Sequence, residues 1–425
     1  MRRMLALMLV LALPLVLASC AEDEEEDRTD PAAAADKVDL ALYNAFDVFQ
    51  SAEDPTDILG MDFTGSYNLF EQAVTLDPNN MNAKAGAAVT NILRLPSDPM
   101  IADLIDELDL ITFVKSTWMP LPSDKGPGTA SGIGHLLLEN LSGAAAPQDD
   151  LRILLTYLVT VLDHSIAYCN AIETHPDFEW IIEFEVESQI DTIEVDVTDI
   201  YMLESPLHWV KALLHGLLAY KMEVASMEEG DLVAALAQDS DFLTLMYPSM
   251  VTSAANDMTV GADEMHMMAQ SLRSEEADQR HDVFTEYTVK QPTGWFPMPS
   301  TLVDQMDAMP TMLEDLMTNP MEITDDFDMD EGTPDATLWL NLGRLFDAPV
   351  VDWKAILPAY TIVPCGADTS SWGIVWEATT IDQWVWHPDS LHGLVQMPPD
   401  AHDITSEEMI GVFGLEEIFE ESGCP

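Results

Sequence analysis

Residues 66–80 are SYNLFEQAVTLDPNN, and residues 83–88 are AKAGAA. In a helix over the first stretch, Phe70 and Ala73 share a face because they are three residues apart. A small residue such as Ala73 lets two helices approach closely, and Phe70 fills the space between them. Pro78 has no amide hydrogen, so it ends the first helix. The stretch therefore predicts two packed helices joined by a short turn.

This pattern resembles part of a tetratricopeptide repeat. Phe70, Ala73 and Pro78 keep the Phe, Ala and Pro spacing of that repeat, and residues 76–79 match its usual turn. The resemblance covers about 35 residues, and no second copy appears at the 34-residue period of the family. It implies one recognisable repeat, or an array whose other members have diverged. The fold implied is a set of helical hairpins in an α-solenoid-like bundle.

Apolar spacing predicts helices through most of the chain before residue 300. The expected helical segments are residues 37–94, 99–117, 133–142, 151–172, 201–222 and 262–289. Apolar residues that alternate with acids from Phe178 to Val197 predict one β-hairpin. Arg152, Asp163 and His164 interrupt the apolar run of residues 151–172, which favours a core helix over a membrane span.

The last hundred residues differ in composition. Six of the ten tryptophans lie between Trp339 and Trp386. Residues 292–310 are rich in proline and are expected to connect two units. We therefore expect a mainly α protein. It would have a tetratricopeptide-like helical domain over residues 37–300, with the β-hairpin as an insertion, and a small α+β cap over residues 301–425.

The N-terminus has the three parts of an export signal. Arg2 and Arg3 precede an apolar run, and the run ends in Leu17-Ala18-Ser19-Cys20. This resembles the lipobox of bacterial lipoproteins, in which the chain is cut before the cysteine and the sulfur is acylated. The resemblance implies a signal peptide over residues 1–19 and a lipid on Cys20 that inserts into a bilayer.

Residues 20–36 are expected to form an acidic tether. Residues 22–27 are six consecutive acids, which repel one another and stay solvated. Ala21 stands where an Asp retains some Gram-negative lipoproteins at the inner membrane. We therefore expect a lipid-anchored envelope protein that faces the periplasm or the exterior, with the outer membrane favoured in a diderm host.

The charge of the chain excludes two classes of partner. It has 76 Asp and Glu against 16 Lys and Arg. Nucleic acid is bound through Lys and Arg that neutralise phosphates, so a nucleic-acid partner is not expected. Docking on anionic lipid through a basic face is excluded for the same reason.

Two cysteines are candidates for a disulfide bond. Cys365 and Cys424 lie in loop-like sequence, and the export signal directs them to an oxidising compartment in a diderm host. A bond between them would close a loop of about 60 residues. Cys169 lies in an apolar helical stretch and is expected to be a small core residue.

Metal-ligand spacing is weak in this sequence. Asp326, Asp328 and Asp330 alternate before a glycine and half-resemble a calcium loop, but Thr337 stands where an EF-hand has Glu. The alternatives are a Ca²⁺ site and a solvated acidic turn, and this departure from the EF-hand pattern favours the turn. His208 and His215 are two helical turns apart, which is too far to chelate one metal in a straight helix.

Four tryptophans near the C-terminus are candidate ligand-binding residues. Exposed rings stack on sugars or peptides, whereas buried rings form a core, and the mixed spacing favours a core. The four are Trp372, Trp376, Trp384 and Trp386.

The function expected from these observations is binding rather than catalysis. Helical-hairpin arrays present surfaces to peptides and partner proteins, so we expect a scaffold or binding component of the envelope with an envelope protein as partner. Tetratricopeptide lipoproteins of this general type include partners of TRAP-type transporters. The alternative is a carbohydrate-binding or hydrolytic envelope protein that uses the C-terminal tryptophans and nearby carboxylates.

Overall fold

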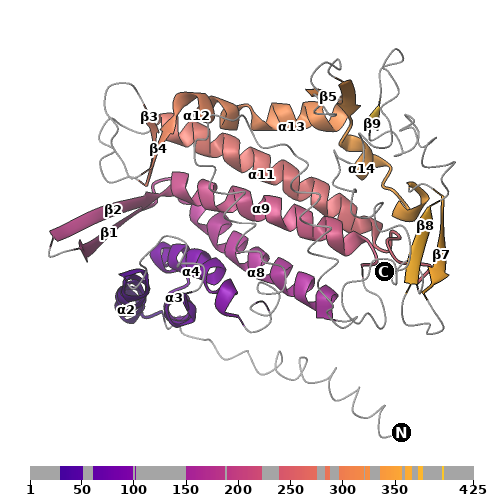
Figure 1. Cartoon of the computed structure of the whole chain (residues 1–425). Helices are drawn as coiled ribbons and strands as arrows, with labels where there is room; N and C mark the ends of the chain where they lie inside the picture. The colour runs from indigo at the N-terminus through magenta and orange to yellow at the C-terminus, as the bar shows by residue number, and fades with distance from the viewer. Residues whose placement is uncertain are drawn as a thin grey trace, which may run out of the picture.

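The computed structural model of the chain describes residues 29–50, 61–98, 101, 150–186, 189–222, 239–274, 283–287, 296–319, 321–325, 336–356, 359–365, 372–376 and 395–396. These residues are mainly helical with small sheets, which confirms the expected fold class. Three long helices run side by side, and a compact group of helices lies against the first of them (Figure 1). The helices are α2 (Pro31–Gln50), α3 (Thr64–Leu76), α4 (Met81–Leu93), α8 (Asp150–Glu173), α9 (Val197–Ala219), α11 (Pro248–Ser274), α12 (Ser300–Asp307), α13 (Met309–Thr318) and α14 (Gly343–Asp347).

The helical pair expected from residues 66–88 is present as α3 and α4. The amide of Asp77 donates to the carbonyl of Ala73 and closes α3. Asn80 then caps α4, because its side-chain oxygen accepts from the amide of Ala83 at 2.9 Å. Phe70 is 1% exposed and lies between the two helices. The relation of this hairpin to the tetratricopeptide repeat stays a prediction.

Helix α2 begins inside the segment that we assigned to the tether. Asp30 accepts from the amide of Ala33 at 3.0 Å, and Pro31 occupies the first helical position, where a missing amide hydrogen has no cost. Ala34 is fully buried in the core that α2 shares with α3 and α4. The alanines after Pro31 therefore belong to the folded unit and not to a solvated linker.

The expected β-hairpin is also present. Strand β1 (Glu179–Val186) pairs antiparallel with β2 (Gln189–Asp196), so that Trp180 lies opposite Val195. The Trp180 ring meets the Phe70 ring edge-on, with centroids 6.3 Å apart. The hairpin thus packs one face on the N-terminal helices. Asp196 then starts α9 with a capping box.

Helices α8, α9 and α11 form the central bundle (Figure 1). Leu162 and Ile166 of α8 pack with Leu207 and Leu214 of α9. Gly261 allows α11 to approach α9 closely, since a Cβ atom there would lie 3.1 Å from the carbonyl oxygen of Ser205. The close contact of α9 and α11 brings their polar side chains into reach of each other.

The structure differs from the expectation for residues 248–310. Helix α11 begins at Pro248, well before residue 262, and residues 284–287 form strand β3 instead of continuing a helix. The proline-rich segment is not a simple connection. It contains strand β4 (Phe296–Pro299), parallel to β3, and helix α12. Pro299 directly precedes α12 and Pro310 lies in the first turn of α13, where a missing amide hydrogen is tolerated, so these two prolines do not prevent helices.

The C-terminal part carries short strands and docks on the bundle. Its described strands are β5 (Met321–Asp325), β6 (Ala336–Leu340), β7 (Tyr360–Pro364), β8 (Trp372–Trp376) and β9 (Val395–Gln396). Two short 3₁₀ helices complete the described elements, η2 (Leu95–Ser97) and η3 (Trp353–Ile356). The ring of Trp353 packs against Tyr220 at the end of α9, with centroids 5.8 Å apart.

One described helix, Arg152–Glu173, is long and apolar enough to cross a membrane by length and composition. Of its most apolar window, 44% is buried inside the fold. It packs against α4 and α9, as a core helix does.

Candidate functional site

A groove of about 500 Å³ opens between the α3–α4 hairpin and α8. Its walls are polar and aromatic side chains from all three helices and the residue that follows α4. The lining residues are Tyr67, Asn91, Arg94, Tyr157, Thr160, Val161, Asp163, His164 and Ala167.

Arg94 is held in one orientation on one wall of this groove. Its Nε and Nη2 donate to Asn91 Oδ1 at 3.1 and 2.9 Å, and its guanidinium lies 4.4 Å from the centre of the Tyr67 ring. Asn91 is 1% exposed and donates to the carbonyl of Val161 and to Ser165 Oγ. A buried asparagine that ties α4 to α8 therefore fixes Arg94, whose Nη1 also lies 3.6 Å from Asp98 Oδ2.

Glu71 organises the neighbouring surface beside His164. The His164 Nε2 lies 3.0 Å from Glu71 Oε1, and the hydroxyl of Tyr168 donates to the same oxygen at 2.8 Å. Burial raises the pKa of Tyr168, and the carboxylate of Glu71 raises it further. Tyr168 therefore stays protonated and acts as a hydrogen-bond donor.

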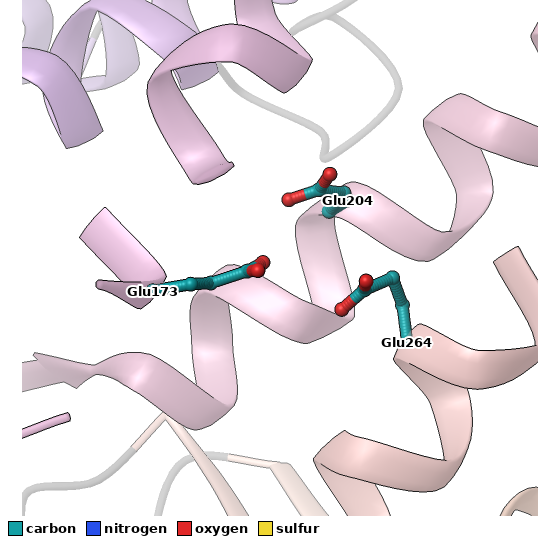
Figure 2. A group of neighbouring side chains, drawn as sticks. All are labelled: Glu173, Glu204 and Glu264. Carbon is teal, nitrogen blue, oxygen red and sulfur yellow. The ribbon is translucent and has the colours of Figure 1, made fainter. Parts of the chain in front are cut away.

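A second constellation lies inside the bundle, where three glutamates converge from three helices. We call Glu173 of α8, Glu204 of α9 and Glu264 of α11 the glutamate cluster. Their side chains point toward a common centre (Figure 2), and one carboxylate oxygen from each lies within 4.8 Å of the others. Oxygen atoms at this separation, on separate helices, could hold a metal ion.

Burial dominates the electrostatics of the glutamate cluster. It raises the pKa of Glu173 to about 8 and the pKa values of Glu204 and Glu264 to about 7. The hydrogen bond between Glu173 and Glu204 requires a shared proton, since two ionised carboxylates have no donor. At neutral pH the cluster therefore retains protons that an exposed glutamate would have lost.

A stripe of polar residues continues from Glu204 along one face of α9. Glu204, His208, Lys211 and His215 recur at spacings of four, three and four, which puts them on the side that faces α11. Asp257 of α11 meets this stripe. Its carboxylate oxygens lie 3.4 Å from His208 Nδ1, 2.7 Å from His215 Nδ1 and 3.1 Å from Lys211 Nζ. His208 in turn lies 3.3 Å from Glu204 Oε1 and connects Asp257 to the cluster.

Most of the residues singled out from the sequence lie outside the described part of the chain. Trp372 and Trp376 lie at the two ends of β8. Cys365 is disulfide-bonded and Cys169 is a buried free thiol, but the pairing of Cys365 with Cys424 stays a prediction. The candidates outside the described residues are Cys20, Asp326, Asp328, Asp330, Trp384, Trp386 and Cys424.

The glutamate cluster was missed by sequence reasoning. The chain has 76 acids, so three separate glutamates do not stand out. A usable signal exists in α9, where Glu204, His208, Lys211 and His215 form one polar stripe in a largely apolar helix. His208 and His215 both contact Asp257, with their Nδ1 atoms 3.4 and 2.7 Å from its carboxylate oxygens.

No known protein family, curated protein or solved structure matches this chain significantly. The function is therefore inferred from the residues and their geometry.

Proposed function

We propose that this chain is a lipid-anchored protein of the bacterial cell envelope that acts by binding, with the groove between the α3–α4 hairpin and α8 as its ligand site. The lipobox at residues 17–20 supports the anchor. The groove supports the binding role. Its ligand is a small molecule or a peptide segment of an envelope partner with a planar polar group.

The observation that carries the binding role is the fixed guanidinium of Arg94. Asn91 and the ring of Tyr67 hold it before any ligand arrives. A preorganised polar group lowers the conformational entropy lost on binding. The groove is also within the range of roughly 300–1,000 Å³ that small-molecule sites occupy. Tyr67 and Tyr157 add aromatic surface for a planar group.

Replacing Cys20 by serine should release the protein from membranes. The acyl chains on the cysteine sulfur would be the anchor, and each buried methylene contributes about 0.8 kcal/mol. The measurement is metabolic labelling with a radioactive fatty acid, followed by membrane fractionation. Unlabelled wild-type protein, or a labelled Cys20→Ser protein, would refute the anchor.

Filling the groove should prevent ligand binding without unfolding the protein. Ala167 is exposed on α8 and lines the groove, so Ala167→Trp inserts a large ring into it. Ile153→Trp is the matched control, because Ile153 is 52% exposed on the same helix and does not line the groove. Native mass spectrometry of protein purified from its own envelope should show a bound species in the wild type and in the control, and none in Ala167→Trp.

Two results would contradict the groove as the ligand site. One is a wild-type protein that carries no bound species from its native envelope. The other is equal occupancy of Ala167→Trp and Ile153→Trp.

A further inference from the structure

Apart from the proton that Glu173 and Glu204 share, three carboxylate oxygens of the glutamate cluster have no hydrogen-bond donor among the described residues. They are buried and come one from each side chain: Glu173 Oε1, Glu204 Oε2 and Glu264 Oε2. A buried carboxylate without a partner is costly, because it has lost its hydration. One carboxylate oxygen from each side chain lies within 4.8 Å of the other two, so the cluster requires either shared protons or a bound cation.

Glu204 supplies an independent indication that the cluster has a ligand. The residue is 1% exposed, and its two oxygens have different surroundings. Oε1 accepts a hydrogen bond from the side-chain Nδ2 of Asn170 at 2.8 Å and lies 3.3 Å from His208 Nε2. Oε2 has no partner among the described residues and belongs to the carboxylate that faces Glu173 and Glu264. One oxygen of Glu204 is thus held by neighbouring side chains, while the other has no hydrogen-bond donor among the described residues.

This arrangement is how proteins orient metal ligands. A ligating carboxylate is usually held through its second oxygen by neighbouring hydrogen bonds, and those neighbours tune the affinity. Asn170 and His208 have this position relative to Glu204, and Asp257 orients His208 in turn. The cluster therefore combines three possible metal ligands with neighbouring side chains that hold Glu204 in position.

The basic groups near the cluster, Lys211 and His208, lower the pKa values of its glutamates less than burial raises them. Lys211 pairs with Asp163 at 2.7 Å and with Asp257 at 3.1 Å. The ammonium group of Lys211 is thus paired with two aspartates and not with Glu204. A divalent cation would balance the glutamates directly.

We propose that Glu173, Glu204 and Glu264 bind one hard divalent cation of the Mg²⁺, Mn²⁺ and Ca²⁺ class inside the helical bundle. Carboxylate oxygens select this class, whereas thiolate and imidazole favour zinc, copper and iron. Among the described residues, the ligand atoms that converge here come from the three glutamates, and the sulfur of Cys169 is not one of them. This site is separate from the groove and does not depend on the proposed function.

The test uses Mn²⁺ and the protein as purified from its host in detergent, stripped with a chelator. Bound Mn²⁺ loses the six-line electron paramagnetic resonance signal of the free ion, so the titration counts sites directly. The buffer contains 0.5 M sodium chloride to screen the many surface acids, since the Debye length is then only about 4 Å. We expect one tight site per chain, with Mg²⁺ and Ca²⁺ as competitors.

Two isosteric variants remove a ligand while keeping the shape. Glu204→Gln and Glu264→Gln should each weaken Mn²⁺ binding at least about tenfold, and Asn170→Ala should weaken it about tenfold because Asn170 holds Glu204 in position. Glu314→Gln is the matched control, because Glu314 is exposed on α13 and far along the chain from the cluster. It should bind Mn²⁺ like the wild type. Circular dichroism establishes that each variant is folded.

Absence of a tight Mn²⁺ site in the wild type would overturn the proposal and leave a cluster that only shares protons. Equal Mn²⁺ binding by the wild type and folded Glu204→Gln or Glu264→Gln would also overturn it. If both glutamine variants fail to fold, Asn170→Ala decides, since Asn170 is no ligand itself. Unchanged affinity in that variant would count against the site.

Discussion

Truncating Phe70 to alanine should lower the free energy of unfolding by about 3–5 kcal/mol, which is the usual cost of emptying a buried aromatic site. The ring is 1% exposed, lies between α3 and α4 and meets Trp180 of the β-hairpin. Its loss should loosen the N-terminal helices and the hairpin together. Urea unfolding followed by circular dichroism measures the change.

Pro78→Gly is the comparison within the same motif. Pro78 lies in the turn between α3 and α4, so its loss acts mainly on the entropy of the unfolded chain and should cost about 1 kcal/mol or less. Equal urea midpoints for Pro78→Gly and Phe70→Ala would contradict the packing role of Phe70.

A double-mutant cycle with Gly86 sharpens this prediction. A Cβ atom on Gly86 would lie 2.3 Å from the Phe70 ring, so Gly86→Ala should destabilise the wild type. In the Phe70→Ala background the ring is gone and the methyl group has room. The cost of Gly86→Ala should therefore shrink or vanish there, and additive costs would show that the two residues are not in contact.

Raising the pH from 6 to 9 in the presence of a chelator should destabilise the protein. The folded-state pKa values of Glu173, Glu204 and Glu264 are about 8, 7 and 7, all above the ordinary value of 4.5. The folded state therefore binds more protons than the unfolded state between pH 4.5 and pH 8, and its stability falls as the pH rises through that window. Ordinary carboxylates are already ionised at pH 6, so they contribute little to the change.

Glu204→Gln should restore most of the stability that the ionisation of Glu204 removes at high pH. Glutamine keeps an oxygen that accepts from Asn170, but it carries no charge to desolvate. A shift from 4.5 to about 7 corresponds to about 3 kcal/mol, so the variant should be more stable than the wild type by roughly that amount at pH 9 and nearly equal to it at pH 5. Thermal unfolding of the variant and the wild type between pH 5 and pH 9 measures the difference in stability.

The exposed control for the pH experiment is Glu314→Gln. Because Glu314 is in water, its substitution should change stability by less than about 0.5 kcal/mol at every pH. A Glu204→Gln protein with the pH profile of the wild type would show that the glutamate cluster is not the source of the pH dependence.

The local elements of this fold were predictable where neighbouring residues determine the backbone. Phe70, Ala73 and Pro78 indicated α3, its turn and α4, and the alternation around Trp180 indicated the β-hairpin. These signals need only residues close in the chain. The errors arose where local patterns compete: the alanines after Pro31 suit a linker or a helix, and the prolines near residue 300 suit a connection or helix starts.

The sequence by itself determined the helical class, the strong negative charge and the lipobox, because these follow from composition and from short contiguous motifs. Only the tertiary structure brought Glu173, Glu204 and Glu264 together. Each is one of many acids, and although the polar stripe of α9 marks Glu204, nothing in the sequence links it to Glu173 or Glu264. Its burial depends on how closely α9 packs on α11, which Gly261 permits, and on the register of α8. A carboxylate changes from a solubilising group into a perturbed, unpartnered one when packing removes its water, and packing is a property of the folded chain.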